Sequence, residues 1–110
     1  MKTPSRQTLM RIYLEENDRF QGRPVYQAIV EAARQDGLGG AIVLKGVLGY
    51  GYKAEARAGK MIKHDDNPPV LIEIVDAEEK LKKFQPRLDE FIREALVTFQ
   101  PVEALHYKLD

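Results

Sequence analysis

The order of apolar and polar positions predicts four β-strands. Residues 9–14 alternate between two sides, as in a strand with two partly apolar faces. The stretches 41–50 and 70–75 are almost continuously apolar and rich in β-branched residues, which is typical of buried strands. A fourth strand is expected over residues 97–109, where Pro101 requires a bulge, an edge position or a break.

Two further segments have helical spacing. Apolar residues recur at helical intervals between Pro24, which suits the first position of a helix, and Gly37, which ends the run. A second helix follows Asp76, which together with Glu79 predicts a capping box. Pro86 falls inside this helix and is expected to kink or divide it.

The element order predicts an α+β domain with a ferredoxin-like βαββαβ sandwich. Strand, helix, strand, strand, helix, strand is the split βαβ pattern, with a four-stranded antiparallel sheet and both helices on one face. The strands are apolar on both sides, so the second face needs a cover, for which we expect other copies of the same sheet. We predict an N-terminal tail over residues 1–8 and a single domain over residues 9–109.

A glycine-rich strand end and the loop after it are the expected functional region. Gly46 within the second strand suggests a bulge or a close backbone approach. The polar loop 52–69 exceeds the ~12–15 residues beyond which unstructured loops are uncommon and tend to be functional or disordered. Backbone amides at Gly49 and Gly51 could approach an anion closely, and Tyr50 could stack on a base. The alternatives are that the glycines only end a strand and that the tyrosine packs at an interface.

Composition excludes several classes of function. The 110 residues include 17 basic and 17 acidic side chains, which removes the simplest argument for nucleic-acid binding. Cysteine is absent, so disulfides and thiolate catalysis are excluded, and the one serine, Ser5, lies in the predicted tail. No run approaches the ~18 apolar residues of a membrane span, and the first residues lack the apolar region of a signal peptide. We therefore expect a cytoplasmic protein that is neither an enzyme nor embedded in a membrane.

Histidine and aspartate side chains give the sequence one candidate metal site. His64, Asp65 and Asp66 form one histidine-bearing cluster, and His106 is the second histidine of the chain. Imidazole and carboxylate groups can bind a divalent cation, although the spacing here does not require one. The simpler interpretation is a solvated loop.

An ordered set of short segments resembles the PII-type signalling proteins, and most of all their branch named domain of unknown function 190. The segments are residues 11–14 (RIYL), 16–20 (ENDRF), 22–26 (GRPVY), 37–46 (GLGGAIVLKG), 49–51 (GYG), 69–76 (PVLIEIVD) and 96–98 (LVT). The resemblance runs from about residue 9 to residue 107 and implies a homotrimer whose three sheets face inward. It also implies that the loop after Gly51 contacts target proteins, and that an adenine nucleotide binds in the cleft between subunits.

Carried over by position, the resemblance implies a nucleotide site at Gly49, Tyr50 and Gly51, with Lys53 and, on the last strand, Lys108. Residues 95–100 contain no glycine where PII proteins have a Gly-Asp-Gly-Lys phosphate loop, which favours a smaller or less charged nucleotide. The branch is associated with membrane fluoride-export channels, so a transport protein is the implied partner.

Three hypotheses follow from the sequence. The first is a trimeric sensor without a resident cofactor, in which an adenine nucleotide at the cleft changes how the loop 52–69 meets a partner. The second is a cation-tolerance protein of the same architecture that binds divalent ions through His64 and Asp65. The third is a trimer without a ligand.

Overall fold

The structure is a computed structural model and describes residues 1–51, 61–63 and 67–109. The chain forms β1 (Lys2–Glu15), β2 (Arg19–Phe20), β3 (Arg23–Pro24), α1 (Val25–Gln35), β4 (Ala41–Lys45), β5 (Leu48–Gly49), β6 (Ile62–Lys63), β7 (Pro69–Asp76), α2 (Glu78–Phe91) and β8 (Leu96–Tyr107).

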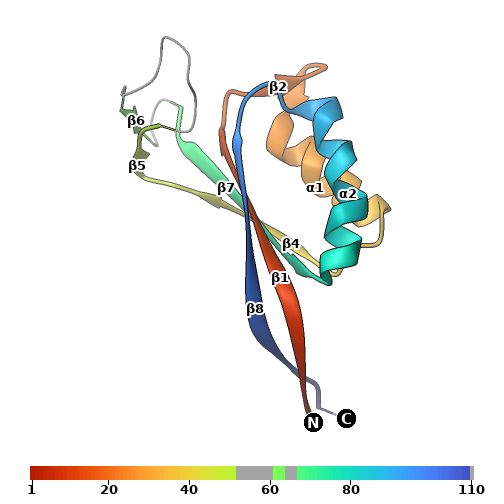
Figure 1. Ribbon diagram of the computed structural model, residues 1–110. Coiled ribbons are helices and arrows are strands. Elements are labelled where there is room, and N and C mark those ends of the chain that lie inside the picture. Colours follow the sequence, from red (N-terminus) through yellow and green to blue (C-terminus); the bar gives the residue numbers. More distant parts are fainter. Residues whose placement is uncertain (52–60, 64–66, 110) are drawn as a thin grey trace.

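The main sheet has four strands in the order β4-β7-β1-β8, and every pairing in it is antiparallel. Both helices cover one face of this sheet (Figure 1). The predicted α+β class, the ferredoxin-like order and the placement of both helices are therefore confirmed.

The core lies between the sheet and the two helices, and it explains why the strands alternate. β1 and β7 direct every second side chain toward the helices, while α1 and α2 each turn one apolar stripe toward the sheet. The buried apolar residues are Met10, Ile12, Leu14, Val25, Ala28, Ile29, Ala32, Ala33, Val70, Ile72, Ile74, Leu81, Phe84, Leu88 and Phe91.

The first strand is longer than the sequence predicts. Residues 2–8, expected to be a tail, continue β1 and pair with β8 from Lys2 opposite Tyr107 to Thr8 opposite Pro101. β7 pairs with β1 only from Thr8 onward, so β1 and β8 continue alone as a two-stranded ribbon that ends at the termini (Figure 1). These residues carry little apolar periodicity because the ribbon packs against no helix, and the pattern alone therefore gave no signal for a strand.

The second predicted strand is divided at Gly46. β4 ends at Lys45, and β5 pairs with β6 in a separate two-stranded sheet. The close backbone approach expected at Gly46 is confirmed, because its N–H donates to the carbonyl oxygen of Pro69 at 2.7 Å. A Cβ atom at Gly46 would lie 2.7 Å from Cγ of Pro69, nearer than real Cβ contacts come.

For α2, the predicted capping box is wrong, and so is the division of the helix that was one of two outcomes expected at Pro86. The N-cap is Ala77, without a side-chain cap, because the Asp76 carboxylate instead accepts hydrogen bonds from the backbone N–H groups of Gly39 at 2.8 Å and Ala77 at 2.7 Å. Pro86 does not divide the helix, which runs unbroken from Glu78 to Phe91. Pro86 is exposed, so water can reach the backbone carbonyl that loses its hydrogen bond there.

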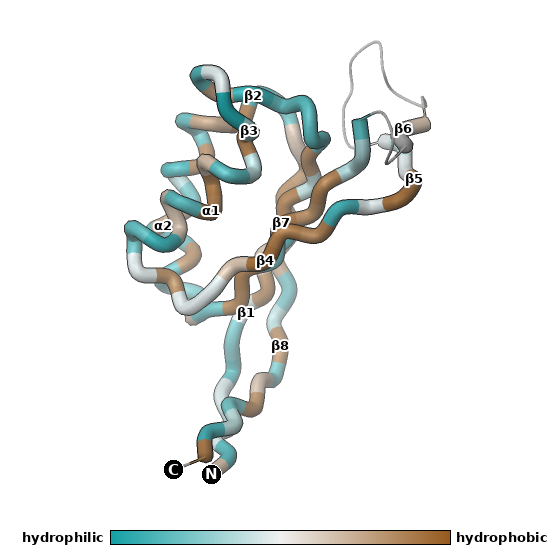
Figure 2. Tube along the Cα trace, turned by 180° about the vertical axis from the view of Figure 1, so that it is seen from behind, coloured by the Kyte–Doolittle hydropathy of each residue, from teal (hydrophilic) through white to brown (hydrophobic). Residues whose placement is uncertain are grey.

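The face of the sheet opposite the helices, here called the helix-free face, remains apolar. Ile42 and Leu44 on β4 are 60% and 47% exposed, and Val75 and Leu96 are exposed on β7 and β8. Figure 2 shows apolar residues along β4 and β7, and also in β5 beyond the main sheet. The same face also carries an ion pair, in which Arg11 Nε lies 2.9 Å from Glu73 Oε2. No helix in the described part of the chain is long and apolar enough to cross a membrane.

Candidate functional site

A cavity of about 230 Å³ lies where β4 ends and the glycine-rich stretch begins. Its walls come from three neighbouring strands and from the chain leading into β5. The lining residues are Tyr13, Leu14, Leu44, Lys45, Gly46, Leu48, Gly49, Pro69, Val70 and Leu71. The cavity is thus formed mainly by apolar side chains and by backbone, as small-molecule sites commonly are.

Glycines form one wall because the chain passes close to Pro69. A Cβ atom on Gly49 would lie 3.4 Å from Cγ of Pro69, in van der Waals contact with it, and one on Gly46 would clash. Gly51 has φ +99°, a conformation that side chains disfavour. Between these glycines Tyr50 is 63% exposed, so its ring is available to a ligand or a partner.

Lys45 lines this cavity at the end of β4, but its ammonium is paired with Glu16, which is not among the lining residues. The Lys45 ammonium contacts the carboxylate of Glu16, which raises the pKa of Lys45 above its ordinary value, and it lies 5.8 Å from the centre of the Tyr26 ring. Lys45 therefore remains charged at neutral pH. Its position at the end of an apolar strand, directly before Gly46, was a signal that the sequence interpretation did not use.

A buried polar network holds the chain that enters β7. The carboxylate of Glu15 accepts a hydrogen bond at 2.7 Å from the side-chain amide of Asn67, and both residues are 4% exposed. The amide oxygen of Asn67 accepts the backbone N–H of Asn17 at 2.9 Å. The carbonyl of Pro68 accepts the N–H of Glu16 at 3.0 Å. These bonds fix the entry to β7 against the end of β1, beside the cavity.

The structure brings together only some of the predicted site residues. Gly49, Tyr50 and Gly51 are adjacent and reach the cavity through Gly49. Lys108 lies at the far end of the β1–β8 ribbon, where its N–H donates to the carbonyl of Met1 at 2.9 Å (Figure 1). Within one chain, Lys108 is therefore apart from the glycines.

Three predicted residues lie outside the described residues: Lys53 of the nucleotide site, and His64 and Asp65 of the cation alternative. Their roles remain predictions from sequence. Within the described ranges, no three histidine or acidic side chains gather as a metal site.

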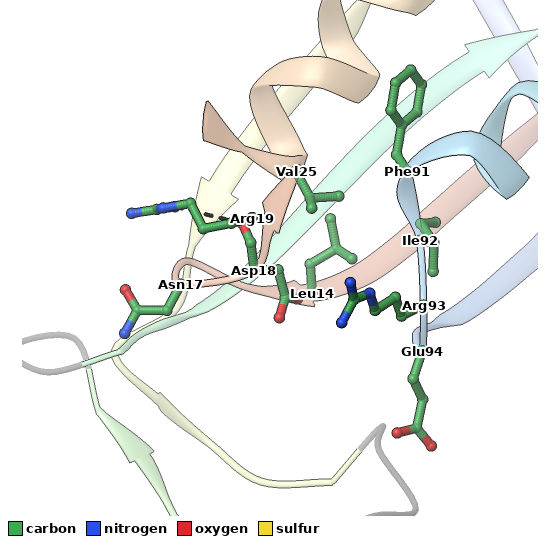
Figure 3. Close-up of a pocket in the computed structure, with 9 residues that line it drawn as sticks. All are labelled: Leu14, Asn17, Asp18, Arg19, Val25, Phe91, Ile92, Arg93 and Glu94. Atoms are coloured by element: carbon green, nitrogen blue, oxygen red, sulfur yellow. Dashed lines mark hydrogen bonds between the residues drawn. The ribbon is translucent and has the colours of Figure 1, made fainter. Parts of the chain in front are cut away.

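A second cavity, of about 420 Å³, lies between the β1–β2 turn and the end of α2 (Figure 3). Its floor is apolar, with Leu14 and Val25 from β1 and α1. Arg93 points into it toward Leu14, and Asp18 lies on the opposite side. The sequence interpretation missed this cavity, because its walls join residues about 70 positions apart without a recognisable motif.

Known proteins resemble this chain in sequence and, at lower identity, in fold. The family model DUF190, described as "Uncharacterized ACR", matches residues 7–104. A "UPF0166 protein" of Aquifex aeolicus (strain VF5) is 36% identical over 98 residues, covering 89% of this chain and 92% of the relative. "UPF0166 protein MJ1524" of Methanocaldococcus jannaschii is 38% identical over 85 residues, covering 77% of this chain and 78% of the relative.

Solved structures share the fold at lower identity. The apo form of CPII, a nitrogen regulatory PII-like protein from Thiomonas intermedia K12, matches with a TM-score of 0.58 and 14% identity, covering 97% of this chain and all of CPII. CPII bound to ADP, AMP and bicarbonate matches with a TM-score of 0.58 and 15% identity, covering 93% of this chain and 96% of CPII. A putative PII-like signalling protein from Thermus thermophilus has a TM-score of 0.57 and 16% identity, with 94% and 91% of the two chains covered. At such identity the likeness shows a common PII-like fold.

Proposed function

The chain belongs to the DUF190 family, and from its PII-like fold we propose that it is a non-enzymatic regulator that binds an adenine nucleotide. The observation that carries this proposal is the fold shared with CPII, whose structure contains ADP, AMP and bicarbonate. The expected site is the cavity at Gly49, with Tyr50 and Gly51 beside it and Lys53 following in the sequence.

The geometry supports a nucleotide at this position in two ways. Glycines in the cavity wall let the backbone come near a phosphate group. Tyr50 offers an exposed ring that can stack on adenine. An open cavity of about 230 Å³ accepts only part of a nucleotide, so a second surface must complete the site.

We infer that the second surface belongs to another copy of the chain in a homotrimer. The apolar helix-free face supports an assembly, because contiguous apolar surface on a sheet generally marks an interface. In such a trimer, groups of a neighbouring copy would complete the site.

The proposed output is binding to a transport protein, such as a fluoride channel, in the cytoplasm. The segment 52–63 carries four basic side chains, Lys53, Arg57, Lys60 and Lys63, against one acidic side chain, Glu55. This positive charge suits an acidic protein surface. A nucleotide would alter the affinity of this segment for the partner.

The test is thermal unfolding with AMP, ADP, ATP, bicarbonate and divalent cations, together with the mass in solution. A ligand at 100 times its dissociation constant adds about 2.7 kcal/mol to the free energy of unfolding. We expect a selective upward shift with an adenine nucleotide, on a protein with the mass of a trimer.

Gly49→Val tests the position of the site. The added side chain contacts Pro69 and occupies part of the cavity, so it should abolish the nucleotide shift while leaving an unliganded folded protein. Gly40→Val is the matched control, because a Cβ atom at Gly40 meets nothing within 4 Å, and it should keep the shift. An unchanged shift in Gly49→Val would place the nucleotide elsewhere, and a cation shift alone would favour the site at His64 and Asp65.

A further inference from the structure

We propose that the second cavity, between the β1–β2 turn and the end of α2, binds a small amphoteric molecule of the class of free α-amino acids with apolar side chains. Arg93 would bind the carboxylate group of this ligand, and Asp18 would bind its ammonium group. The cavity at Gly49 shares only Leu14 with this one. The second site is therefore distinct from the proposed nucleotide site and does not depend on it.

The cavity has the size and the lining of a small-molecule site. Its volume of about 420 Å³ lies within the range of ~300–1,000 Å³ that is usual for such sites. Leu14 and Val25 form its floor, and both are buried apolar residues. The charged lining residues stand beside this floor (Figure 3). Such a surface suits a ligand that has an apolar part as well as charged groups.

Arg93 is the group that would hold a carboxylate. Its guanidinium is directed from the end of α2 into the cavity (Figure 3). Among the residues that the structure describes, this guanidinium has no ion pair and no hydrogen bond. By contrast, Arg87 within α2 pairs with Asp36 at 2.7 Å and with Glu90 at 3.0 Å. A guanidinium presents parallel N–H donors that match the two oxygens of a carboxylate, so Arg93 is available for a ligand of that kind.

Asp18 lies on the wall opposite Arg93, and hydrogen bonds of the loop hold it there. Its Oδ2 atom accepts the backbone N–H of Glu15 at 3.0 Å. Its own N–H donates to the carbonyl of Glu15 at 3.1 Å, and its carbonyl accepts the N–H of Val25 at 2.9 Å. The carboxylate is thus positioned before a ligand arrives, which lowers the cost of binding. A carboxylate can accept several hydrogen bonds at once, so its role in the loop is compatible with binding an ammonium group.

The charges around the cavity favour an amphoteric ligand over a simple anion or cation. The charged lining residues are two acids and two arginines, Asp18, Glu94, Arg19 and Arg93. Arg19 extends away from the cavity, and its Nη1 atom donates to the carbonyl of Glu16 at 2.9 Å (Figure 3). A simple anion at Arg93 would face the negative charge of Asp18, and a simple cation at Asp18 would face Arg93. A molecule that carries both charges meets each side chain with the opposite sign.

Isothermal titration calorimetry with the common L-amino acids tests the proposal on the unmodified chain. We expect binding of the apolar members, with L-leucine at least about tenfold tighter than L-alanine, because its longer side chain covers more of the apolar floor. The amide of the tightest binder lacks the carboxylate, and its N-acetyl derivative lacks the ammonium group. Each derivative should bind at least about tenfold more weakly than the free amino acid, since each loses one charge-assisted contact.

Two variants assign the contacts to Arg93 and Asp18. Arg93→Gln alters an exposed side chain, so it should keep the stability of the unliganded protein and weaken amino-acid binding at least about tenfold. Arg19→Gln is the matched control, because this arginine lines the same cavity but points away from it, and it should bind like the original chain. In Asp18→Asn the side-chain oxygen can still accept the N–H of Glu15. This variant should lose most of the preference for the free amino acid over its N-acetyl derivative.

Three results would overturn the proposal. The first is that no amino acid of the panel binds at concentrations of tens of millimolar. The second is that the N-acetyl derivative binds as tightly as the free amino acid, which would make the cavity a site for simple carboxylates. The third is that Arg93→Gln and Arg19→Gln bind with equal affinity, because the ligand would then lie away from Arg93.

Discussion

Gly46 and Pro69 fit closely together just beyond the end of β4, beside the start of β7. The N–H of Gly46 bonds to the Pro69 carbonyl, while the proline ring occupies the space where a side chain at Gly46 would begin. The proline ring is stiff, so relief of a clash must come from the backbone. This contact therefore requires a glycine at position 46.

We therefore predict that Gly46→Ala lowers the free energy of unfolding by about 1–3 kcal/mol, the usual cost of overpacking. Equilibrium unfolding in urea measures it. Gly40→Ala is the control: a Cβ atom there meets nothing, so this variant should be as stable as the original chain or slightly more stable. Equal stability of both variants would mean that Pro69 moves aside at no cost.

Asn67 has a comparable role through hydrogen bonding. It donates to the buried Glu15 carboxylate and accepts the N–H of Asn17, so Asn67→Ala removes both bonds. We expect the free energy of unfolding of Asn67→Ala to fall by about 2–3 kcal/mol, because hydrogen bonds to charged groups are among the stronger ones. Asn17→Ala keeps its backbone N–H and has an exposed side chain, so its stability should change little. If thermal unfolding shows Asn17→Ala to be less stable than Asn67→Ala, the hydrogen bonds of Asn67 do not stabilise the fold.

At the scale of single residues, the sequence shows which positions have a local backbone constraint, but it does not show which distant residues form hydrogen bonds. Gly46 was identifiable because a glycine inside an apolar strand implies a close approach. Asn67 was not, because its partner Glu15 lies 52 positions earlier and neither residue belongs to a motif. The capping box failed for a related reason: the carboxylate of Asp76 bonds instead to Gly39, which only the folded chain brings near.

At the scale of elements, α2 tolerates a proline that should weaken it. Pro86 lies in an unbroken helix of 14 residues and faces solvent. The buried face on the other side of the helix, formed by Leu81, Phe84, Leu88 and Phe91, anchors both halves to the sheet. Packing therefore outweighs the local preference.

Pro86→Ala should consequently raise the free energy of unfolding. Proline costs about 3 kcal/mol relative to alanine inside a helix, and its restriction of the unfolded chain offsets up to about 1 kcal/mol, which leaves a gain of about 2 kcal/mol. Urea unfolding of Pro86→Ala beside Gln85→Ala, an exposed neighbour expected to change little, measures this gain. A less stable Pro86→Ala would show that the proline fits a local bend.

Element types were predictable where the apolar period was clear, and element ends were not. Both helices and the central strands follow from their periods of 3.6 and 2 residues. The short pairs β2–β3 and β5–β6 have two residues per strand, too few for any period to show. The extension of β1 to Lys2 depends on β8, about 100 residues later in the chain.

At the scale of the whole molecule, the proposed assembly depends on the apolar helix-free face. Leu44 is 47% exposed on that face, although it belongs to an apolar strand. We predict that Leu44→Glu raises the dissociation constant of the proposed trimer at least about 100-fold, since burying an unpaired charge costs several kcal/mol and each 1.4 kcal/mol is tenfold.

Analytical ultracentrifugation over a range of concentrations measures this dissociation. Val47→Glu is the control, because Val47 is 73% exposed and lies between β4 and β5, outside the main sheet. A Leu44→Glu protein that still sediments as a trimer at low concentration would show that the copies meet through another surface.

The overall architecture and the family were accessible from sequence, whereas the complete site was not. Element order is encoded in successive segments, and the resemblance to domain of unknown function 190 is confirmed by the match over residues 7–104. The predicted partner of the glycines, Lys108, lies at the opposite end of the chain's own fold. No pattern within one chain reports which groups a second copy would bring.

The pairing of β1 with β8 has a consequence for how the chain folds. β1 is synthesised well before its neighbour β8, from which it is separated in sequence by two helices and the other strands of the sheet. The sheet therefore cannot be completed until β8 has been made, and one edge of β1 stays unpaired until then. Such distant pairings slow folding toward the range of milliseconds to seconds, so nascent chains of this protein should depend on protection from aggregation until β8 has emerged.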